Sequence, residues 1–248
     1  MQFKDYFSAQ ADEYARRRPN YPPDLFEYLA SLTAVRDLAW DCGTGNGQAA
    51  VGIAPYFERV IATDPSPDQL RNAFQHPGVT YTQATAEESG LQSASVDLVT
   101  VAQAVHWFDL DRFYTEVKRV LKPGGVCAIW CYILCRISPE LDIIIDRFYF
   151  ETVGPYWPRE RAIVDDGYAS LHFPFDAIEA PDFAIELEWE LEDLIGYLGT
   201  WSPVRRYIEA NGHDPIAIIA DSLRSAWGNP TERRRVVWPV KMRVGRSS

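Results

Sequence analysis

The residues with the clearest chemical meaning form the stretch Asp41-Cys42-Gly43-Thr44-Gly45-Asn46-Gly47, which closes a short apolar run. Glycines at alternate positions let the backbone turn sharply after a strand and let a ligand approach without a Cβ atom in the way. The next apolar run ends in Asp64, whose carboxylate can accept hydrogen bonds from both hydroxyls of a ribose, or can cap a helix that begins near Ser66. We predict an adenosine-cofactor site formed by Asp41, Gly43, Gly45, Asp64 and Pro65.

The spacing of the glycines bears on which cofactor this is. A dinucleotide-binding loop of the form Gly-x-Gly-x-x-Gly requires glycine at position 48, where this sequence has Gln48. The sequence also lacks a second glycine pair of that kind. A nicotinamide-dependent oxidoreductase is therefore the weaker interpretation of this loop.

Three cysteines, Cys127, Cys131 and Cys135, recur at every fourth position and raise the question of a metal or iron–sulfur site. They lie in the apolar segment 124–135, which is typical of a buried strand in which odd positions share one face. Residues four apart in a strand are separated by about 13 Å, too far to bind one ion or cluster. No histidine lies nearby in the sequence to complete a zinc site. We predict core cysteines and no metal.

The elements that must position the glycine loop alternate between strand and helix patterns. We expect strands at 38–41, 59–63, 79–83, 96–102 and 126–133, with helices after Gly47, at 67–74 and at 110–121. Such alternation implies right-handed βαβ crossovers and a parallel sheet with helices on both faces.

After residue 133 the pattern changes. A helix at 139–150 leads into a segment rich in proline and aromatic residues at 154–181, and strands are expected at 183–189 and 236–244. Helical patterns at 191–198, 203–210 and 215–227 lie between those two strands. We interpret these helices as a lid on a terminal strand pair. The first 32 residues show two helical patterns broken by prolines.

The glycine loop and Asp64 resemble the first two motifs of the class I S-adenosylmethionine (SAM) dependent methyltransferases. Three further segments are similar to that family in the same order, namely Ala84-Thr85-Ala86-Glu87, Ser95-Val96-Asp97-Leu98-Val99 and Leu121-Lys122-Pro123-Gly124-Gly125. The resemblance implies an α/β, Rossmann-like fold with a mostly parallel seven-stranded sheet and an antiparallel last strand. It also implies SAM as cofactor, with Ala86 and Glu87 beside the adenine.

Other motifs resemble one branch, the trans-aconitate methyltransferases and their bacterial relatives. These motifs are Tyr14 with Arg18-Pro19-Asn20-Tyr21-Pro22, the segment Gln103-Ala104-Val105-His106-Trp107-Phe108, and Tyr197 with Thr200-Trp201-Ser202. The resemblance implies cofactor contacts from Tyr14, Arg18, Gln103 and Trp107. Tyr21 and Trp201 would bind the acceptor. The aromatic residues Phe7, Tyr14, Trp107 and Trp201 could be core residues, or they could form an aromatic wall that suits the sulfonium cation of the cofactor.

The nucleophile decides which residues carry the transfer. His106 follows the expected fourth strand, where open α/β sheets place ligands, and could act as general base toward a phenol or amine. A carboxylate is already ionised at pH 7 and needs no base. Arg18, Arg205 and Arg206 could then bind the acid through paired hydrogen bonds. The sequence leaves both routes open.

Composition limits the partners of the protein. Its 248 residues carry a formal net charge of −11, which repels phosphate backbones and anionic lipid, so neither nucleic acid nor a membrane is expected as partner. The N-terminus has no apolar run typical of a signal peptide, and no stretch approaches the about 20 apolar residues of a membrane span. We expect a cytoplasmic monomer or homodimer.

Together these observations predict a single domain, 1–248. It would comprise an N-terminal helical cap (1–35), a SAM-binding core (36–135) and terminal strands with a helical lid insertion (136–248). The expected activity is SAM-dependent methyl transfer to a small-molecule acceptor, at an oxygen such as a carboxylate. The alternative from another class is a SAM-binding regulatory protein that has lost catalysis.

Overall fold

The structure is a computed structural model and describes residues 19–247. A mixed sheet runs through this part of the chain in the order β3-β2-β1-β4-β5-β8-β6, with β7 also paired to β8. Strands β1 to β5 pair in parallel and β8 is antiparallel to its neighbours. The bounds are β1 Leu38–Cys42, β2 Arg59–Asp64, β3 Val79–Gln83, β4 Val96–Ala102, β5 Leu121–Tyr132, β6 Asp176–Ile178, β7 Phe183–Trp189 and β8 Arg234–Arg246.

The eight strands of the described chain fill seven positions in the sheet. Strand β6 pairs with residues 244–246 of β8, and β7 pairs with residues 234–240 along the same side of that strand. Pro181 lies between β6 and β7 and has no backbone N–H to give to a ladder. The predicted fold class is therefore confirmed, with its last position divided into two short strands that flank a proline.

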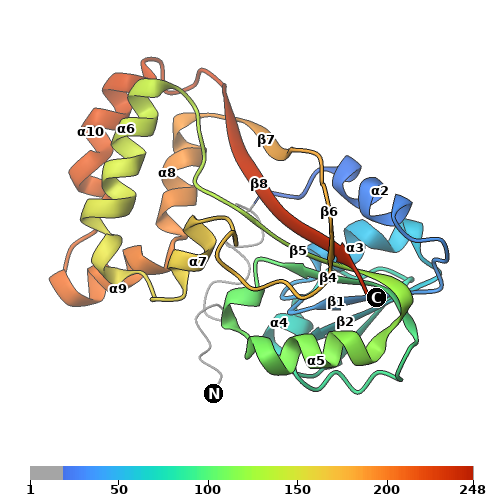
Figure 1. Ribbon diagram of the computed structural model, residues 1–248. Coiled ribbons are helices and arrows are strands. Elements are labelled where there is room, and N and C mark those ends of the chain that lie inside the picture. Colours follow the sequence, from blue (N-terminus) through green and yellow to red (C-terminus); the bar gives the residue numbers. More distant parts are fainter. Residues whose placement is uncertain (1–18, 248) are drawn as a thin grey trace.

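Helices cover both faces of the sheet (Figure 1). Helices α2 (Pro23–Ser31) and α3 (Gln48–Ile53) pack against even positions of β5, and α5 (Leu110–Val120) packs against odd ones. Cys127 and Cys131 are fully buried on the α5 side, and Cys135 is buried in the opposite cluster. The prediction of core cysteines is confirmed. Burial raises the pKa of Cys131 to about 12.

The remaining helices of the described chain stand to one side of the sheet, apart from the short α4 (Pro67–Arg71) (Figure 1). They are α6 (Pro139–Arg147), α7 (Arg161–Asp165), α8 (Leu191–Gly199), α9 (Ser202–Asn211) and α10 (Ile216–Trp227). Single turns occur at Ala54–Tyr56, Val105–Trp107 and Gly154–Tyr156, and a π-helical turn at Phe148–Thr152 continues α6. The helix expected at 67–74 thus ends earlier, at Arg71, whereas the helix expected at 139–150 changes from α-helix to a π-helical turn after Arg147.

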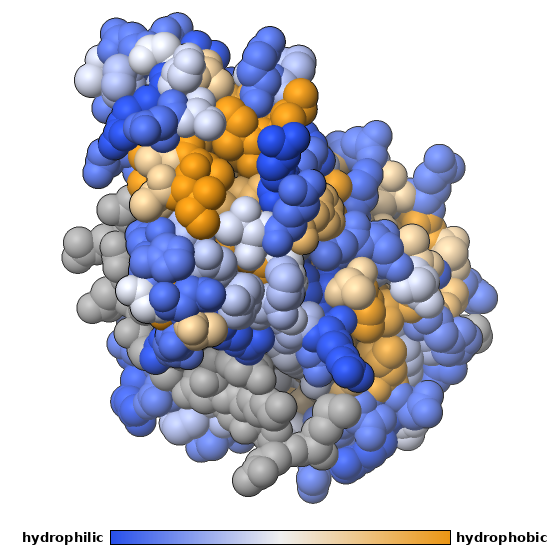
Figure 2. Space-filling view, turned by 90° about the vertical axis from the view of Figure 1, so that its left-hand side faces the viewer, coloured by the Kyte–Doolittle hydropathy of each residue, from blue (hydrophilic) through white to orange (hydrophobic). Residues whose placement is uncertain are grey.

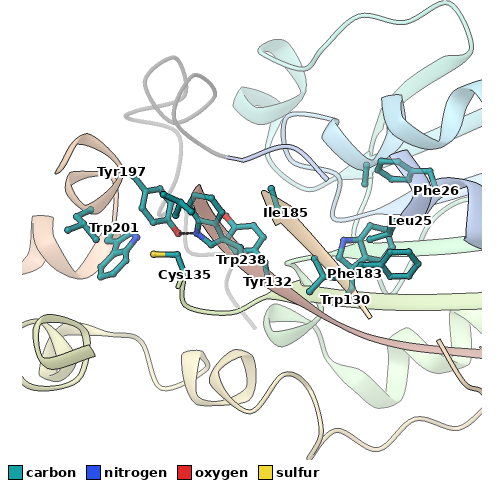
Figure 3. Close-up of a cluster of buried hydrophobic side chains, with 14 of the residues drawn as sticks. Leu25, Phe26, Trp130, Tyr132, Cys135, Phe183, Ile185, Tyr197, Trp201 and Trp238 are labelled. Atoms are coloured by element: carbon teal, nitrogen blue, oxygen red, sulfur yellow. Dashed lines mark hydrogen bonds between the residues drawn. The ribbon is translucent and has the colours of Figure 1, made fainter. Parts of the chain in front are cut away.

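An aromatic cluster joins this helical part to the sheet (Figure 3). The indole Nε1 of Trp238 on β8 donates a hydrogen bond to the hydroxyl of Tyr197 on α8, 3.1 Å away. Trp201 packs edge-on against Tyr197 with ring centroids 5.8 Å apart. Because these side chains are buried, the helical part and the end of β8 share one core.

The outer face of the helical part is partly apolar (Figure 2). Ile143, Phe150, Ile208 and Ile218, on α6, the π-helical turn, α9 and α10, are among the exposed large hydrophobic residues. Across residues 19–247, no helix combines the length and the apolarity that crossing a membrane requires.

Candidate functional site

The strand order reverses between β1 and β4, and ligands of open α/β sheets bind outside the carboxyl ends of the strands at such a point. The glycine loop begins there, with Gly43, Gly45 and Gly47 all at positive φ. A Cβ atom on Gly43 would lie 2.7 Å from the Cβ of Ala104, so packing requires this glycine. A Cβ atom on Gly45 would meet nothing nearer than 3.9 Å. Gly45 is therefore the position that faces open space.

Asp41 holds the start of the loop. Its carboxylate accepts hydrogen bonds from the hydroxyls of Thr44, at 2.5 Å, and Thr100 on β4, at 2.8 Å. The side chain is buried, and desolvation raises the pKa of Asp41 to about 6. These contacts make Asp41 a residue that positions the loop between β1 and β4.

Asp64 links the loop to the end of β2. One carboxylate oxygen accepts the amide of Gly45 and the other accepts the amide of Ser66, each at 2.9 Å. The hydroxyl of Ser66 itself caps α4 by accepting the amide of Gln69. Pro65 follows Asp64, and its carbonyl accepts the amide nitrogen of the Gln83 side chain. Asp64 thus orders the backbone on both sides of the end of β2.

The segment expected beside the adenine lies next to Asp64. The amide of Ala84 donates to the carbonyl of Asp64 at 3.3 Å, and Ala86 is buried. The carboxylate of Glu87 accepts the amide of Asp109, at the start of α5, at 2.9 Å. The loops after β2, β3 and β4 therefore converge at one edge of the sheet.

Gln103 and the turn that follows it lie directly after β4, at the same carboxyl end of the sheet. Gln103 has a φ of +56°, rare for a residue with a side chain, and its Nε2 atom donates to the carbonyl of Tyr132 on β5. Tyr168 has a φ of +65° and is fully buried. Residues in such sparsely populated conformations cluster at functional sites.

His106 contacts Tyr168 and Trp107. Its Nδ1 atom lies 3.0 Å from the hydroxyl of Tyr168, and its ring is 4.9 Å from the ring of Trp107. Burial, followed by the positive charge of nearby Arg161, lowers the pKa of His106 to about 3. The imidazole is therefore neutral at pH 7 and is a weak base.

Arg161 was not singled out by the sequence, and the structure places it beside this histidine. Its Cζ atom lies 4.7 Å from the ring centroid of Trp157, and its Nε atom donates to the hydroxyl of Tyr149 at 2.6 Å. Asp165, one turn along α7, is its ion-pair partner at 3.2 Å. In the sequence, the segment 154–181 was notable only for its aromatic and proline residues. No local pattern therefore identified Arg161 as a candidate.

The remaining acceptor-side candidates are more scattered. Trp201 is buried and stacks on Phe148 at 6.0 Å, within the aromatic group that includes Tyr149. Arg206 donates to the carbonyl of Tyr156 at 3.0 Å. Arg205 does not join the others: its side chain is 58% exposed and forms an ion pair with Glu209.

Of the N-terminal candidates Tyr14, Arg18 and Tyr21, the structure describes Tyr21. Tyr21 packs edge-on against Trp130 of β5 at 5.5 Å. It also lines a cavity of about 750 Å³ between the start of α2 and strands β7 and β8, whose lining contains none of the glycine-loop residues. Tyr14 and Arg18 lie outside the described residues.

The residues present fit an adenosine cofactor better than a metal. The glycine loop contains a buried donor, Nδ2 of Asn46, that lacks a hydrogen-bond partner, and it leaves open the space over Gly45. Asp64 offers carboxylate oxygens at the adjoining strand end. Within residues 19–247, no three His, Cys, Asp or Glu side chains are grouped so that they could hold a metal ion.

Comparisons with known proteins agree with this geometry. The sequence model described as a methyltransferase domain matches residues 40–129, which span the glycine loop, Asp64 and His106. The chain is 38% identical to a Dictyostelium discoideum protein named as a methyltransferase, over 91% of this chain and 87% of that one. It is 32% identical to a methyltransferase of Aspergillus candidus, over 99% and 77% of the two chains.

Among solved structures, a protein from Anaeromyxobacter dehalogenans named as a type II methyltransferase superposes with a TM-score of 0.88. It is 49% identical and the match covers 92% of this chain and 97% of that one. The chain belongs to the methyltransferase family, with the Rossmann-like fold of the class I enzymes. Its cofactor is SAM.

Proposed function

We propose that this methyltransferase transfers its methyl group to an oxygen of a small-molecule acceptor, and that this oxygen belongs to a carboxylate. The observation that carries the proposal is the state of His106, the candidate base. Its pKa of about 3 leaves it poorly suited to remove a proton from a phenol or an ammonium ion at pH 7. A carboxylate needs no such step, because it is ionised at that pH.

The cofactor supplies a methyl group on a positively charged sulfur. The carboxylate oxygen forms the new bond to the methyl carbon while the carbon–sulfur bond breaks, and the electron pair of that bond stays on the sulfur. The products are a methyl ester and S-adenosylhomocysteine, and no proton is transferred. The chain's own task is then to align the two reactants and to exclude water.

We assign these tasks to two groups of residues. The cofactor would be held by the glycine loop, Asp64 with Pro65, the pair Ala86 and Glu87, and Gln103 with Trp107, as well as by Tyr14 and Arg18. The acceptor would lie between His106 and the aromatic side chains of the helical part, including Trp201, with Tyr21 and Arg206 at its margins. The division into cap, core and lid remains a prediction.

A product screen tests this function. The protein is incubated with SAM carrying a labelled methyl group and with a library of small acids, phenols and amines, and the products are identified by mass spectrometry. We expect label in acids, in a form that mild alkali releases as methanol. Label confined to phenols or amines would contradict the carboxylate proposal. Undiminished SAM binding without any product would favour the regulatory alternative.

Replacement of His106 separates the two kinds of nucleophile. With a carboxylate acceptor, we expect His106→Asn to change turnover by less than about tenfold, because no proton is removed. A loss of about 10² or more would show that His106 acts as a base. Initial rates at saturating SAM provide the measurement, and His172→Asn, at an exposed position, is the control.

A further inference from the structure

The guanidinium group of Arg161 is only partly used by the protein. Its Nε atom makes both of its hydrogen bonds, to Tyr149 and to Asp165. Within residues 19–247, the terminal nitrogens Nη1 and Nη2 have no hydrogen-bond partner. The side chain is 21% exposed, and neither nitrogen is among the fully buried atoms that lack a partner. The fork of the guanidinium is therefore open to a ligand.

The surroundings of Arg161 fix its orientation and leave its charge incompletely compensated. Its Cζ atom lies over the rings of Trp157 and Tyr149, at 4.7 and 5.6 Å from their centroids, and only 21% of the side chain is exposed. Asp165, its one ion-pair partner in the described chain, is itself 34% exposed and also accepts the hydroxyl of Tyr149. A half-buried cation held this firmly costs desolvation energy that a purely structural role does not require.

The charge of Arg161 acts at the candidate acceptor site. It lowers the pKa of His106, and it offsets part of the burial that raises the pKa of Cys131 on β5 and of Tyr168. These three residues come from the turn after β4, from β5 and from the segment after α7. The packing agrees with this: α7, which carries Arg161, lies against the turn Val105–Trp107 after β4, and the thiol of Cys131 on β5 donates to the carbonyl of Val164 on the same helix.

We propose that Arg161 binds a carboxylate of the methyl acceptor through Nη1 and Nη2, with Trp157 and Tyr149 as the aromatic walls of that subsite. This inference rests on the proposed function and names the residue that selects an acid. A planar fork of two N–H groups matches the two oxygens of a carboxylate, which a lysine ammonium does not. Arg205 and Arg206, the candidates from the sequence within the described chain, are engaged with Glu209 and with the carbonyl of Tyr156 instead.

A binding experiment tests Arg161 without requiring the natural acceptor. Benzoate, phenylacetate and succinate are titrated into the protein with S-adenosylhomocysteine present, each beside its uncharged amide, and ligand-observed NMR gives the affinities. We expect at least one acid to bind wild type about tenfold or more tightly than its amide, as for a hydrogen bond to a charged group. Arg161→Gln should remove that preference. Arg159→Gln, an exposed arginine in the same segment, should retain it.

Two results would overturn the assignment: acids and amides binding wild type alike, or an acid preference that survives in Arg161→Gln. Arg161→Lys keeps the charge and removes the fork, so it should restore only part of the preference. Arg161→Lys also provides the test if Arg161→Gln does not fold. Unchanged affinity for S-adenosylhomocysteine, measured by calorimetry, confirms that the cofactor side of each variant is intact.

The outcomes for Arg161 and for the proposed function are separable. Acid binding that depends on Arg161, without any ester in the product screen, would contradict the proposed function and leave the subsite standing. Ester formation with the same Michaelis constant in wild type and Arg161→Gln would contradict the subsite and leave the function standing. Phosphate-bearing compounds that bind in preference to carboxylic acids would contradict the choice of carboxylate.

Discussion

The pKa values of single side chains in this site depend on their surroundings more than on their residue type. His106 and Asp41 are both buried, and desolvation moves each toward its neutral form, so it lowers the pKa of the histidine and raises that of the acid. The histidine therefore stays neutral to about pH 3, while the acid begins to bind a proton near pH 6. Both shifts have consequences for stability.

The first prediction concerns His106 and acid. Because its pKa in the folded protein is about 3, against 6.5 for an ordinary histidine, only the unfolded chain binds this proton between those values. The free energy of unfolding should therefore fall as the pH falls below 6.5, by up to about 1.4 kcal/mol per pH unit from this residue. Urea unfolding at pH 7, 6 and 5 measures the slope.

His106→Asn should reduce that slope, and His172→Asn at an exposed position should not. Asp41 contributes in the opposite sense, since its raised pKa adds stability as the pH falls from about 6 toward 4. This contribution is the same in both variants, so it does not affect the comparison. Identical slopes in wild type and His106→Asn would show that the imidazole is not held neutral.

The second prediction concerns Asp64. Its carboxylate fixes the amides of Gly45 and Ser66, so Asp64→Ala removes the proposed ribose partner and loosens the backbone that surrounds it. We expect SAM binding to weaken by roughly 1.5 to 3 kcal/mol, the range for hydrogen bonds to a charged group. Calorimetry measures the affinity, with Asp68→Ala on α4 as a control. An unchanged affinity would mean that Asp64 acts only on the backbone.

At the level of elements, the glycine loop uses glycine for two different reasons. Gly43 is required because the turn after β4 packs against it, whereas Gly45 has open space beside it. Both have positive φ, so alanine at either position meets backbone strain. Of the two substitutions, Gly43→Ala should also disturb packing.

The third prediction follows from that contrast. Gly45→Ala should cost about 1–2 kcal/mol of stability through its left-handed backbone. Gly43→Ala should cost a further 1–3 kcal/mol, roughly, from overlap with Ala104 and Phe108. Gly45→Ala should also weaken SAM binding markedly in protein that remains folded. Thermal and urea unfolding compare the stabilities, and equal losses for the two variants would contradict this account.

Patterns of local sequence predicted most of the elements, because burial alternates in strands and repeats every three to four residues in helices. The strands expected at 79–83, 96–102 and 183–189 match β3, β4 and β7 residue for residue. Strand β6 was missed because three residues are too few to show alternation. Arg161 was missed because its neighbours His106 and Tyr149 meet it only after folding.

Across the whole molecule, the cofactor should act as a stabiliser. A ligand that binds only the folded state at 100 times its dissociation constant adds about 2.7 kcal/mol. For a chain of this length that corresponds to a rise in melting temperature of roughly 5–11 °C. We therefore predict such a rise with SAM and with S-adenosylhomocysteine, and none with NAD. Differential scanning calorimetry at several concentrations provides the test, and a rise with NAD alone would favour the oxidoreductase alternative.

The order of the elements along the chain has a consequence for descent. The glycine loop, Asp64, Glu87 and His106 fall between β1 and α5, whereas Tyr149, Arg161 and the helices beyond them come after β5. One continuous stretch of the sequence thus contains most of the proposed cofactor site together with His106, and a later stretch contains most of the proposed acceptor site. Mutation or recombination in the later stretch could give a descendant a new acceptor while it inherits the earlier stretch unaltered.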